Sequence, residues 1–213
     1  MVEKALEIAR GYKQHPAFEN YMAGFRDYYE EVFKLLPQSA KTLELGCAYG
    51  ILALMLKLRG DMVITSDMTT EYTNLKMLRD NGILFVKNNI EKQDLKHKFN
   101  LITMTEVIEH LNSNPLPAVK RLHNALHEGG RLFVSTVMKE AHGDTTSMNS
   151  GKKGLWNELD DWHDIPEYKG KWMDEHTFHY DQWNLITLLT EAGFEIEKVG
   201  NINNFSHYII GKK

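Results

Sequence analysis

The residues best suited to chemistry begin with a glycine-bracketed turn early in the chain. Gly46 and Gly50 follow a short apolar stretch, and Glu44 stands two positions before the first glycine. Glycine has no Cβ and tolerates positive φ, so such a turn lets a ligand approach the backbone closely. The spacing is G-x-x-x-G, whereas dinucleotide-binding turns have G-x-G-x-x-G. The turn therefore favours a ligand without a pyrophosphate, and we interpret Cys47 inside it as a small packing residue.

Further polar side chains follow the next apolar runs of the sequence. Asp67 comes directly after one run, and Asn89 with Ile90 comes after another. In an open parallel sheet, ligands bind outside the carboxyl ends of the strands. The Asp67 carboxylate suits the two hydroxyls of a ribose, while Asn89 and Ile90 offer a polar edge and an apolar face to an adenine. The order of these groups indicates one ligand-binding edge.

A third group, Glu106-Val-Ile-Glu109-His110, follows a predicted strand and has two interpretations. His110 is a candidate general base because the unperturbed pKa of histidine lies near neutrality, and His163, His176 and His179 compete for that role. Alternatively, Glu106, Glu109 and His110 share one face of a helix and bind a divalent cation together with a distal histidine. The two roles of His110 exclude each other, because a metallated nitrogen cannot also take a proton.

The elements that must position these residues alternate between strand and helix. Apolar runs predict strands over 42–45, 62–66, 83–86, 100–105, 131–137, 194–199 and 205–210. Helical patterns lie over 1–36, 49–59, 70–80, 116–127 and 181–192. This alternation predicts an α/β fold with a parallel sheet covered on both faces. The last two strands are close in sequence, which favours an antiparallel pair at one edge.

Residues 139–180 break this alternation, and we predict that they cover the substrate. They include three of the four tryptophans, contain no arginine and have a negative formal charge. A nucleic-acid cleft would need basic residues to neutralise phosphates. We therefore expect the substrate to be a small hydroxylated molecule, aromatic or sugar-like, that accepts a transferred group, with amines as the second possibility and RNA as the third. The residues expected to contact the acceptor are Trp162, His163, Trp172, His176 and His179.

Composition limits the remaining possibilities. The chain has 213 residues, 42% of them hydrophobic and 25% charged, a formal charge of −4 and a single cysteine. We predict one domain over 1–213, with an N-terminal helical lid over 1–40 and the covering insertion over 139–180. The sequence predicts no membrane span and no signal peptide, and a cytoplasmic location. It does not indicate the oligomeric state.

Taken together, the motifs resemble those of class I S-adenosylmethionine (SAM)-dependent methyltransferases. The matching segments are 44–50 (ELGCAYG), Asp67, 106–110 (EVIEH), 127–135 (HEGGRLFVS) and 191–195 (EAGFE), and they look closest to the branch containing ubiquinone-biosynthesis O-methyltransferases. The resemblance implies a Rossmann-like, seven-stranded, mostly parallel sheet and SAM as cofactor. It places Glu44, Gly46, Ala48 and Gly50 on the methionine part, Asp67 on the ribose, and Asn89 and Ile90 on the adenine. Further implied contacts are Cys47, Tyr49, Met68, Thr105, Glu106 and Val107.

A second resemblance concerns the possible metal. Small-RNA 2′-O-methyltransferases have a similar E-x-x-E-H set and a later histidine before an aromatic residue, which resembles His176-Thr-Phe178 here. It implies that Glu106, Glu109, His110 and His176 surround one divalent cation beside the methyl group, with Glu106, His110 and His176 acting in catalysis. Two alternatives of another class stay open: a non-catalytic SAM-binding module and, disfavoured by the glycine spacing, an NAD-dependent oxidoreductase.

Overall fold

The computed structural model describes residues 1–138 and 154–213, so the part of the covering insertion over 139–153 lies outside the described residues. Seven strands form one mixed sheet in the order β3-β2-β1-β4-β5-β7-β6, which confirms the predicted α/β fold with a seven-stranded sheet. The strands are β1 (Lys41–Leu45), β2 (Met62–Asp67), β3 (Leu84–Lys87), β4 (Phe99–Thr105), β5 (Leu126–Val137), β6 (Glu195–Ile202) and β7 (Ser206–Lys212).

Six α-helices are present in the described part of the chain: α1 (Val2–Arg10), α2 (Phe18–Leu35), α3 (Ile51–Arg59), α4 (Leu75–Asp80), α5 (Leu116–Ala125) and α6 (Gln182–Glu191). The 3₁₀ turns within the described residues are η1 (Ile108–His110) and η3 (Trp162–Asp164). None of the helices that the structure describes is long and apolar enough to cross a membrane. Contacts divide the chain into two compact units. Unit 1 comprises Met1–Asn89 and Phe99–Thr103, and unit 2 comprises Ile90–Lys98 and Met104–Lys213.

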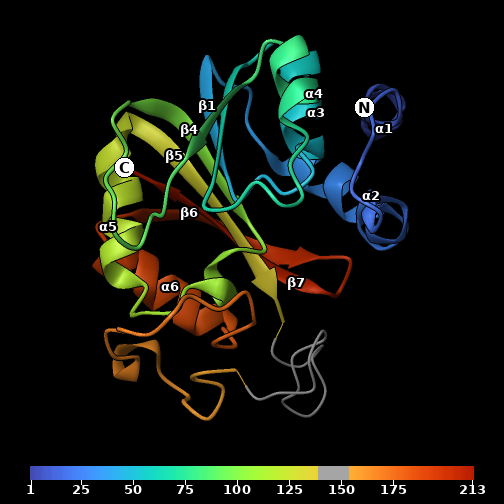
Figure 1. The fold of residues 1–213 in the computed structure, drawn as a ribbon. Helices are drawn as coiled ribbons and strands as arrows, with labels where there is room; N and C mark the ends of the chain where they lie inside the picture. The colour runs from blue at the N-terminus through green and yellow to red at the C-terminus, as the bar shows by residue number, and fades with distance from the viewer. Residues whose placement is uncertain (139–153) are drawn as a thin grey trace. The chain divides into compact units, whose positions relative to one another are not determined.

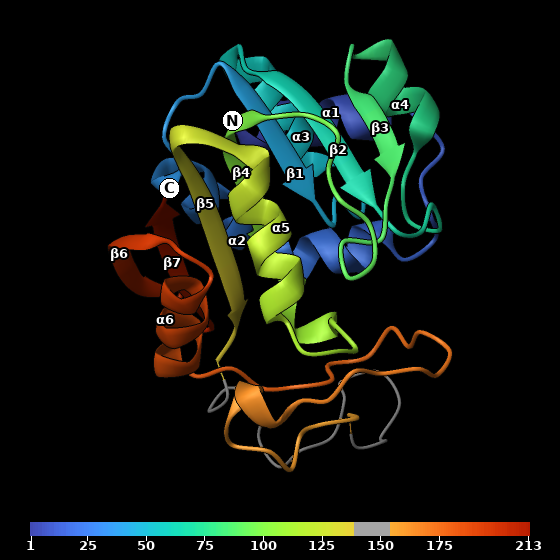
Figure 2. The same ribbon diagram turned by 90° about the vertical axis from the view of Figure 1, so that its left-hand side faces the viewer.

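Unit 1 is built on a parallel three-stranded part of the sheet. β1 pairs with β2 and β2 with β3, all in the same direction (Figure 2). The apolar run after Gly50 forms α3, whose first six residues are all buried. They are buried because α3 packs against β2 while α1 and α2 pack against α3 (Figure 1). The residues over 1–36, for which the sequence predicted helical structure, form the two helices α1 and α2.

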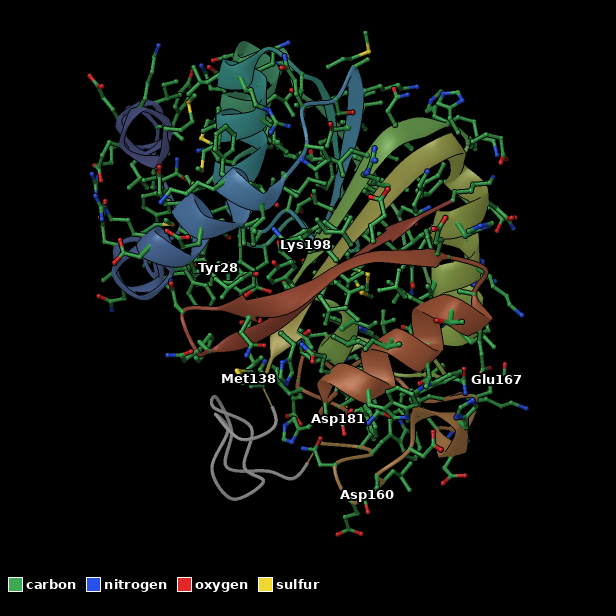
Figure 3. All side chains as sticks on the ribbon, turned by 180° about the vertical axis from the view of Figure 1, so that it is seen from behind. Tyr28, Met138, Asp160, Glu167, Asp181 and Lys198 are labelled. Atoms are coloured by element: carbon green, nitrogen blue, oxygen red, sulfur yellow. The ribbon has the colours of Figure 1, made fainter. Side chains whose placement is uncertain are left out.

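Unit 2 is built on antiparallel strands. β7 pairs with both β5 and β6, as the closeness of the last two strands in sequence predicted. α5 packs against β5, and α6 packs against β6 and β7. Residues 154–180 contain no strand and only η3. They lie beside α6, which begins after Asp181, and the side chain of Asp160 points outward (Figure 3).

The two outer strands of the sheet have different surfaces. β3 is four residues long, and its apolar side chains Leu84 and Val86 are 56% and 38% exposed. No helix or strand forms between β3 and β4 in residues 88–98. β6 is charged instead: Glu195, Glu197 and Lys198 are exposed, and Glu197 forms an ion pair with Arg131 at 2.6 Å.

Two predicted helices have other boundaries in the structure. The helix expected over 70–80 begins at Leu75, because the Asn74 side chain accepts the Met77 N–H at 2.9 Å and caps the helix there. The helix expected over 116–127 ends at Ala125. Strand β5 begins before the predicted residue 131, because Lys213 supplies backbone partners to this part of the chain. The Gly129 N–H donates to Lys213 O at 3.0 Å, and the Lys213 N–H donates to Gly130 O at 2.9 Å.

Candidate active site

The turn after β1 is the first part of the candidate site, in unit 1. Its backbone has positive φ at three positions, 73° at Gly46, 41° at Ala48 and 73° at Gly50. The Gly46 N–H donates to Ser66 O at 2.8 Å, which ties the turn to β2. A Cβ on Gly50 would lie 2.8 Å from Leu78 Cδ2. This position therefore requires glycine both for its φ and for space.

Asp67, at the end of β2, is joined to the same turn. Its Oδ2 accepts the Ala48 N–H at 3.3 Å, and its Oδ1 accepts the Thr69 N–H at 3.0 Å. Glu44 in β1 is only 2% exposed. Burial, reinforced by repulsion from Asp67, raises the pKa of Glu44 well above its usual value. Burial therefore disfavours the charged form of Glu44, while two backbone N–H groups orient Asp67.

Tyr49, within the turn, is the centre of an aromatic cluster. Its ring centroid lies 5.4 Å from that of Phe18, 4.9 Å from Tyr21 and 5.7 Å from Tyr72. The hydroxyl of Tyr21 lies 3.3 Å from that of Tyr29, and burial raises the pKa of Tyr29 well above its usual value. Helix α2 is thus packed onto the turn through the aromatic side chains of Phe18 and Tyr21.

The other residues expected to contact the cofactor lie in both units. Cys47 is 1% exposed and its thiol pKa is raised, mainly by burial. A buried, protonated thiol agrees with the packing role and not with a nucleophile. The remaining predicted residues are half-buried Met68 and Asn89 in unit 1, and buried Ile90, buried Thr105 and half-buried Val107 in unit 2.

Unit 2 contains the side chains that fit a metal ion. Among the residues that the structure describes, Glu109, His110 and His176 each offer one ligand atom, and these atoms lie within 4.8 Å of one another. The two imidazole rings meet edge to face with centroids 4.7 Å apart. Glu109 is 1% exposed, and neither carboxylate oxygen has a hydrogen-bond partner. Burial raises the pKa of Glu109, and nearby His110 offsets only part of that effect.

Glu106 was predicted as a further ligand, but it is not part of the group whose ligand atoms lie within 4.8 Å of one another. The residues 106–110 form no full helical turn with Glu106 on it, because the 3₁₀ turn η1 begins only at Ile108. Glu106 instead has a positive φ of 51° and donates its N–H to Ser135 O at 3.1 Å. Of the three residues predicted to share a helical face, only Glu109 and His110 lie in the group with His176.

Backbone hydrogen bonds fix residues 154–180 to the loop around η1. The Thr177 N–H donates to Glu109 O at 2.7 Å, and the one Thr177 hydroxyl proton is shared between Glu109 O at 3.1 Å and Leu111 O at 2.5 Å. The Asn112 side chain binds both backbone groups of Met173, accepting its N–H at 2.7 Å and donating to its carbonyl at 3.0 Å. The distal histidine is thus carried by a firmly bonded segment.

Two of the predicted acceptor-binding residues, Trp162 and His163, are bonded to other side chains of the protein. Trp162 is 1% exposed, and its Nε1–H donates to Thr187 Oγ1 at 3.0 Å, so its ring belongs to the core of unit 2. His163 is at the surface, stacked on Trp162 at 3.8 Å. Its Nδ1 lies 2.6 Å from Asp161 and its Nε2 lies 2.7 Å from Glu191. These hydrogen bonds, first with Asp161 and then with Glu191, raise the pKa of His163.

Of the other predicted acceptor-binding residues, Trp172 is half-buried. His179 is 6% exposed, and its ring centroid lies 6.4 Å from that of His176. His179 therefore lies close to the group formed by Glu109, His110 and His176, whereas Trp162 and His163 pack on α6.

Sequence reasoning missed Asp174 and Thr177. Asp174 Oδ1 lies 3.4 Å from His110 Nδ1. Burial lowers the pKa of His110, but contacts with Asp174 and Glu109 outweigh it and leave that pKa raised; in turn, His110 lowers the pKa of Asp174. The only signal in the sequence is that Asp174 stands two positions before His176, in a segment where acids are frequent.

The fold and the turn after β1 define the class of this protein. Its structure is similar to that of an S-adenosylmethionine-dependent methyltransferase from Mesorhizobium loti, with a TM-score of 0.64, 16% identity, and coverage of 86% of this chain and 96% of that one. It is also similar to magnesium protoporphyrin IX methyltransferase from Synechocystis with bound S-adenosylhomocysteine, with a TM-score of 0.62, 14% identity, and coverage of 99% and 93%. The class is that of the SAM-dependent methyltransferase fold.

Sequence comparison gives the family. Residues 17–199 match the methyltransferase domain family, and the chain belongs to it. Ubiquinone biosynthesis O-methyltransferase from Pseudomonas syringae is 29% identical over 103 residues, 46% of this chain and 44% of that protein. The Xanthomonas axonopodis enzyme of that name is 22% identical over 179 residues, 79% of this chain and 68% of that protein. The chain thus matches less than half the length of the first relative. The match to the methyltransferase domain family confirms the predicted family.

Proposed function

We propose that this protein transfers a methyl group from SAM to a hydroxyl of a small molecule, with a divalent cation held by Glu109, His110 and His176. Membership of the methyltransferase domain family supports methyl transfer. The names of the curated relatives, which are O-methyltransferases, support an oxygen acceptor. The single observation that carries the cation is the Glu109 carboxylate, which is 1% exposed and has no hydrogen-bond partner beside two imidazoles.

The residues of unit 1 fit the cofactor part of this proposal. The turn from Gly46 to Gly50 has positive φ at three positions, a backbone conformation that lets a ligand approach the main chain closely. Asp67 is oriented by two backbone N–H groups and, as an ionised acceptor, suits the two ribose hydroxyls of SAM. Glu44 carries a raised pKa, and a cationic ammonium such as that of the methionine part would favour its ionised form.

The donor set of unit 2 fits a borderline divalent ion. Two imidazole nitrogens and one carboxylate match Mn²⁺, Fe²⁺, Co²⁺, Ni²⁺ or Zn²⁺ better than Ca²⁺ or Mg²⁺, which prefer oxygen ligands. A buried carboxylate without partners is costly in its charged form. An ion at this position would therefore stabilise ionised Glu109, and its binding would release the Glu109 proton.

The proposed chemistry needs little covalent help from the protein. In the transfer, the acceptor oxygen forms a bond to the methyl carbon, the bond from that carbon to the sulfonium sulfur breaks and leaves S-adenosylhomocysteine, and the hydroxyl proton passes to water. A bound divalent ion lowers the pKa of a coordinated hydroxyl. Glu109, His110 and His176 would hold that ion, while the backbone bonds of Thr177 keep the last histidine in place.

The described part of the covering segment supports a small acceptor. Acidic residues outnumber basic ones in residues 154–180, and this part contains no arginine. Such an acidic segment would not neutralise the phosphates of a nucleic acid. Trp172 and His179 are the residues of the predicted acceptor-binding set that we propose for contact with the acceptor, in addition to His176. We propose no such contact for Trp162, since its ring is covered.

The test is a methyl-transfer assay with SAM and a panel of hydroxylated aromatic and sugar-like compounds. Release of S-adenosylhomocysteine should stop in EDTA and return when one of the borderline ions is added. His176→Ala should lose cation affinity as well as rate. His163→Ala is the matched control, since His163 lies in the same segment but is held by Asp161 and Glu191. It should retain both properties.

Other outcomes of this assay select the other mechanisms. Full activity in EDTA, with loss on His110→Ala, would leave His110 as a general base without a cation. Preference for amines over hydroxyl compounds would favour N-methylation. SAM binding without transfer to any compound of the panel would favour a binding module, and failure to bind either SAM or S-adenosylhomocysteine would reject the proposal.

A further inference from the structure

Asp174 and His110 form a contact that no sequence motif indicated. The Oδ1 atom of Asp174 lies 3.4 Å from Nδ1 of His110. This distance is slightly longer than that of a formed hydrogen bond. The Asp174 side chain is 48% exposed and that of His110 is 28% exposed, while the Nδ1 atom that faces the carboxylate is itself buried.

An imidazole has two nitrogens with different roles. In the neutral ring one nitrogen donates and the other presents a lone pair, and the partner of one nitrogen decides which. A carboxylate can only accept, so its position beside Nδ1 favours the tautomer with the proton on Nδ1. The lone pair then resides on Nε2. Histidines that bind metals commonly have their other nitrogen bonded to a carboxylate or carbonyl in this way.

We infer that Asp174 is a positioning residue that accepts the Nδ1–H of His110 and thereby keeps the Nε2 lone pair available for chemistry. The inference deepens the proposed function and rests on it for the use of that lone pair, which is cation binding. The same tautomer would serve His110 as a general base, because a base also needs a free lone pair. In catalytic sites, hydrogen bonds are often long when no ligand is bound, and they shorten once the ligand binds.

The direct test observes the tautomer by nuclear magnetic resonance. Long-range ¹H–¹⁵N correlation spectra of the full chain, recorded at a pH where imidazoles are neutral, distinguish a protonated nitrogen from a lone pair. The His110 signals are identified by their loss in His110→Gln. The wild type should carry its proton on Nδ1. In Asp174→Asn the amide can donate as well as accept, so the proton should shift wholly or partly to Nε2.

Cation binding gives a second measurement. Asp174→Asn should lower the affinity for Mn²⁺ or Co²⁺, titrated as the metal alone, by about 10- to 100-fold, the usual effect of removing such an outer partner. Glu167→Gln is the matched control, because this acid lies in the same segment, is 78% exposed and is labelled at the surface in Figure 3. It should keep both the tautomer and the affinity. Asp174→Ala, which has no acceptor, should behave as Asp174→Asn does.

The outcomes separate this inference from the proposed function. A wild-type protein with the His110 proton on Nε2, or an unchanged tautomer in both Asp174 variants, overturns the role of Asp174. Equal metal affinity in wild type and Asp174→Asn overturns it as well. A wild-type protein that binds neither Mn²⁺ nor Co²⁺ rejects the cation of the proposed function, while the tautomer measurement still decides the role of Asp174.

Discussion

The buried Thr177 hydroxyl and backbone N–H both meet the carbonyl oxygen of Glu109, at 3.1 and 2.7 Å, although the two residues are 68 positions apart. One threonine thus fixes the backbone of the segment that carries His176 beside the backbone that carries Glu109 and His110. The geometry of the proposed cation site therefore depends on a residue that contributes no ligand atom to it.

Thr177→Val tests this dependence, because valine keeps the shape and removes the hydroxyl. The one buried hydroxyl proton that the carbonyls of Glu109 and Leu111 share is lost, and we expect a loss of about 1–3 kcal/mol in the free energy of unfolding. Urea denaturation measures it. Thr190→Val is the control, since that hydroxyl bonds only to Ile186 O on the exposed side of α6, and it should change stability by less than about 0.5 kcal/mol. Equal losses in both variants would contradict the special role of Thr177.

Gly50→Ala should destabilise the protein and weaken SAM binding. Alanine at a φ of 73° is strained, and its Cβ would meet Leu78 Cδ2 at 2.8 Å. We expect a loss of about 2 kcal/mol or more. Gly24→Ala, within α2 and with no atom within 4 Å of the added Cβ, should instead stabilise by about 0.5–1 kcal/mol. Thermal unfolding of the two variants checks the opposite signs; a stable Gly50→Ala would show that the turn adapts.

Asp67→Asn should reduce SAM affinity while leaving the fold in place. The amide keeps one acceptor for the Ala48 or Thr69 N–H but loses the charge that strengthens bonds to the ribose hydroxyls. A bond to a charged group contributes about 1.5–3 kcal/mol, so we expect affinity to fall on the order of 10- to 100-fold. Isothermal titration measures this. Asp27→Asn, at a side chain 79% exposed, should bind as the wild type does, and an unchanged Asp67→Asn would remove the ribose assignment.

The surface bridge through His163 predicts a pH-dependent contribution to stability. Hydrogen bonds with Asp161 and Glu191 raise the pKa of folded His163, so the folded state binds this proton more tightly than the unfolded one. The contribution is complete below the unfolded pKa of about 6.5. It is lost as the pH rises through the raised folded value. At the acid end, His163 lowers the pKa of Asp161, so that contribution is lost as the pH falls through the lowered value.

Urea denaturation of the wild type and His163→Gln across this range measures the difference. The wild type should be the more stable variant near and below about pH 6.5, and the difference should vanish at higher pH. Because the side chains are about half exposed, salt should also reduce it. His127→Gln, at an exposed histidine of β5, serves as control. A difference that is constant with pH would mean that packing of the ring on Trp162, and not its charge, is responsible.

Local patterns predicted the parts of the structure that local chemistry determines. The turn from Gly46 to Gly50 and the position of Asp67 after a strand follow from glycine spacing and apolar runs, and both are present. The predicted start of α4 was wrong, because Asn74 caps the helix through a side-chain hydrogen bond that the spacing of apolar residues does not indicate. Asp174 and Thr177 were missed because their partners, His110 and Glu109, are more than 60 residues away. An acid or a threonine in an irregular segment carries no local mark of such contacts.

The two outer strands imply different behaviour in concentrated solution. An edge strand presents unpaired backbone groups to other chains, and charged residues discourage such pairing. β6 has this protection in Glu195, Glu197 and Lys198, whereas β3 displays exposed Leu84 and Val86 with only Lys87 beside them. Its length of four residues limits the number of bonds that another chain can add. Aggregation of the folded protein should therefore begin at β3, and a charge introduced at Leu84 would be the first change to make for a more soluble sample.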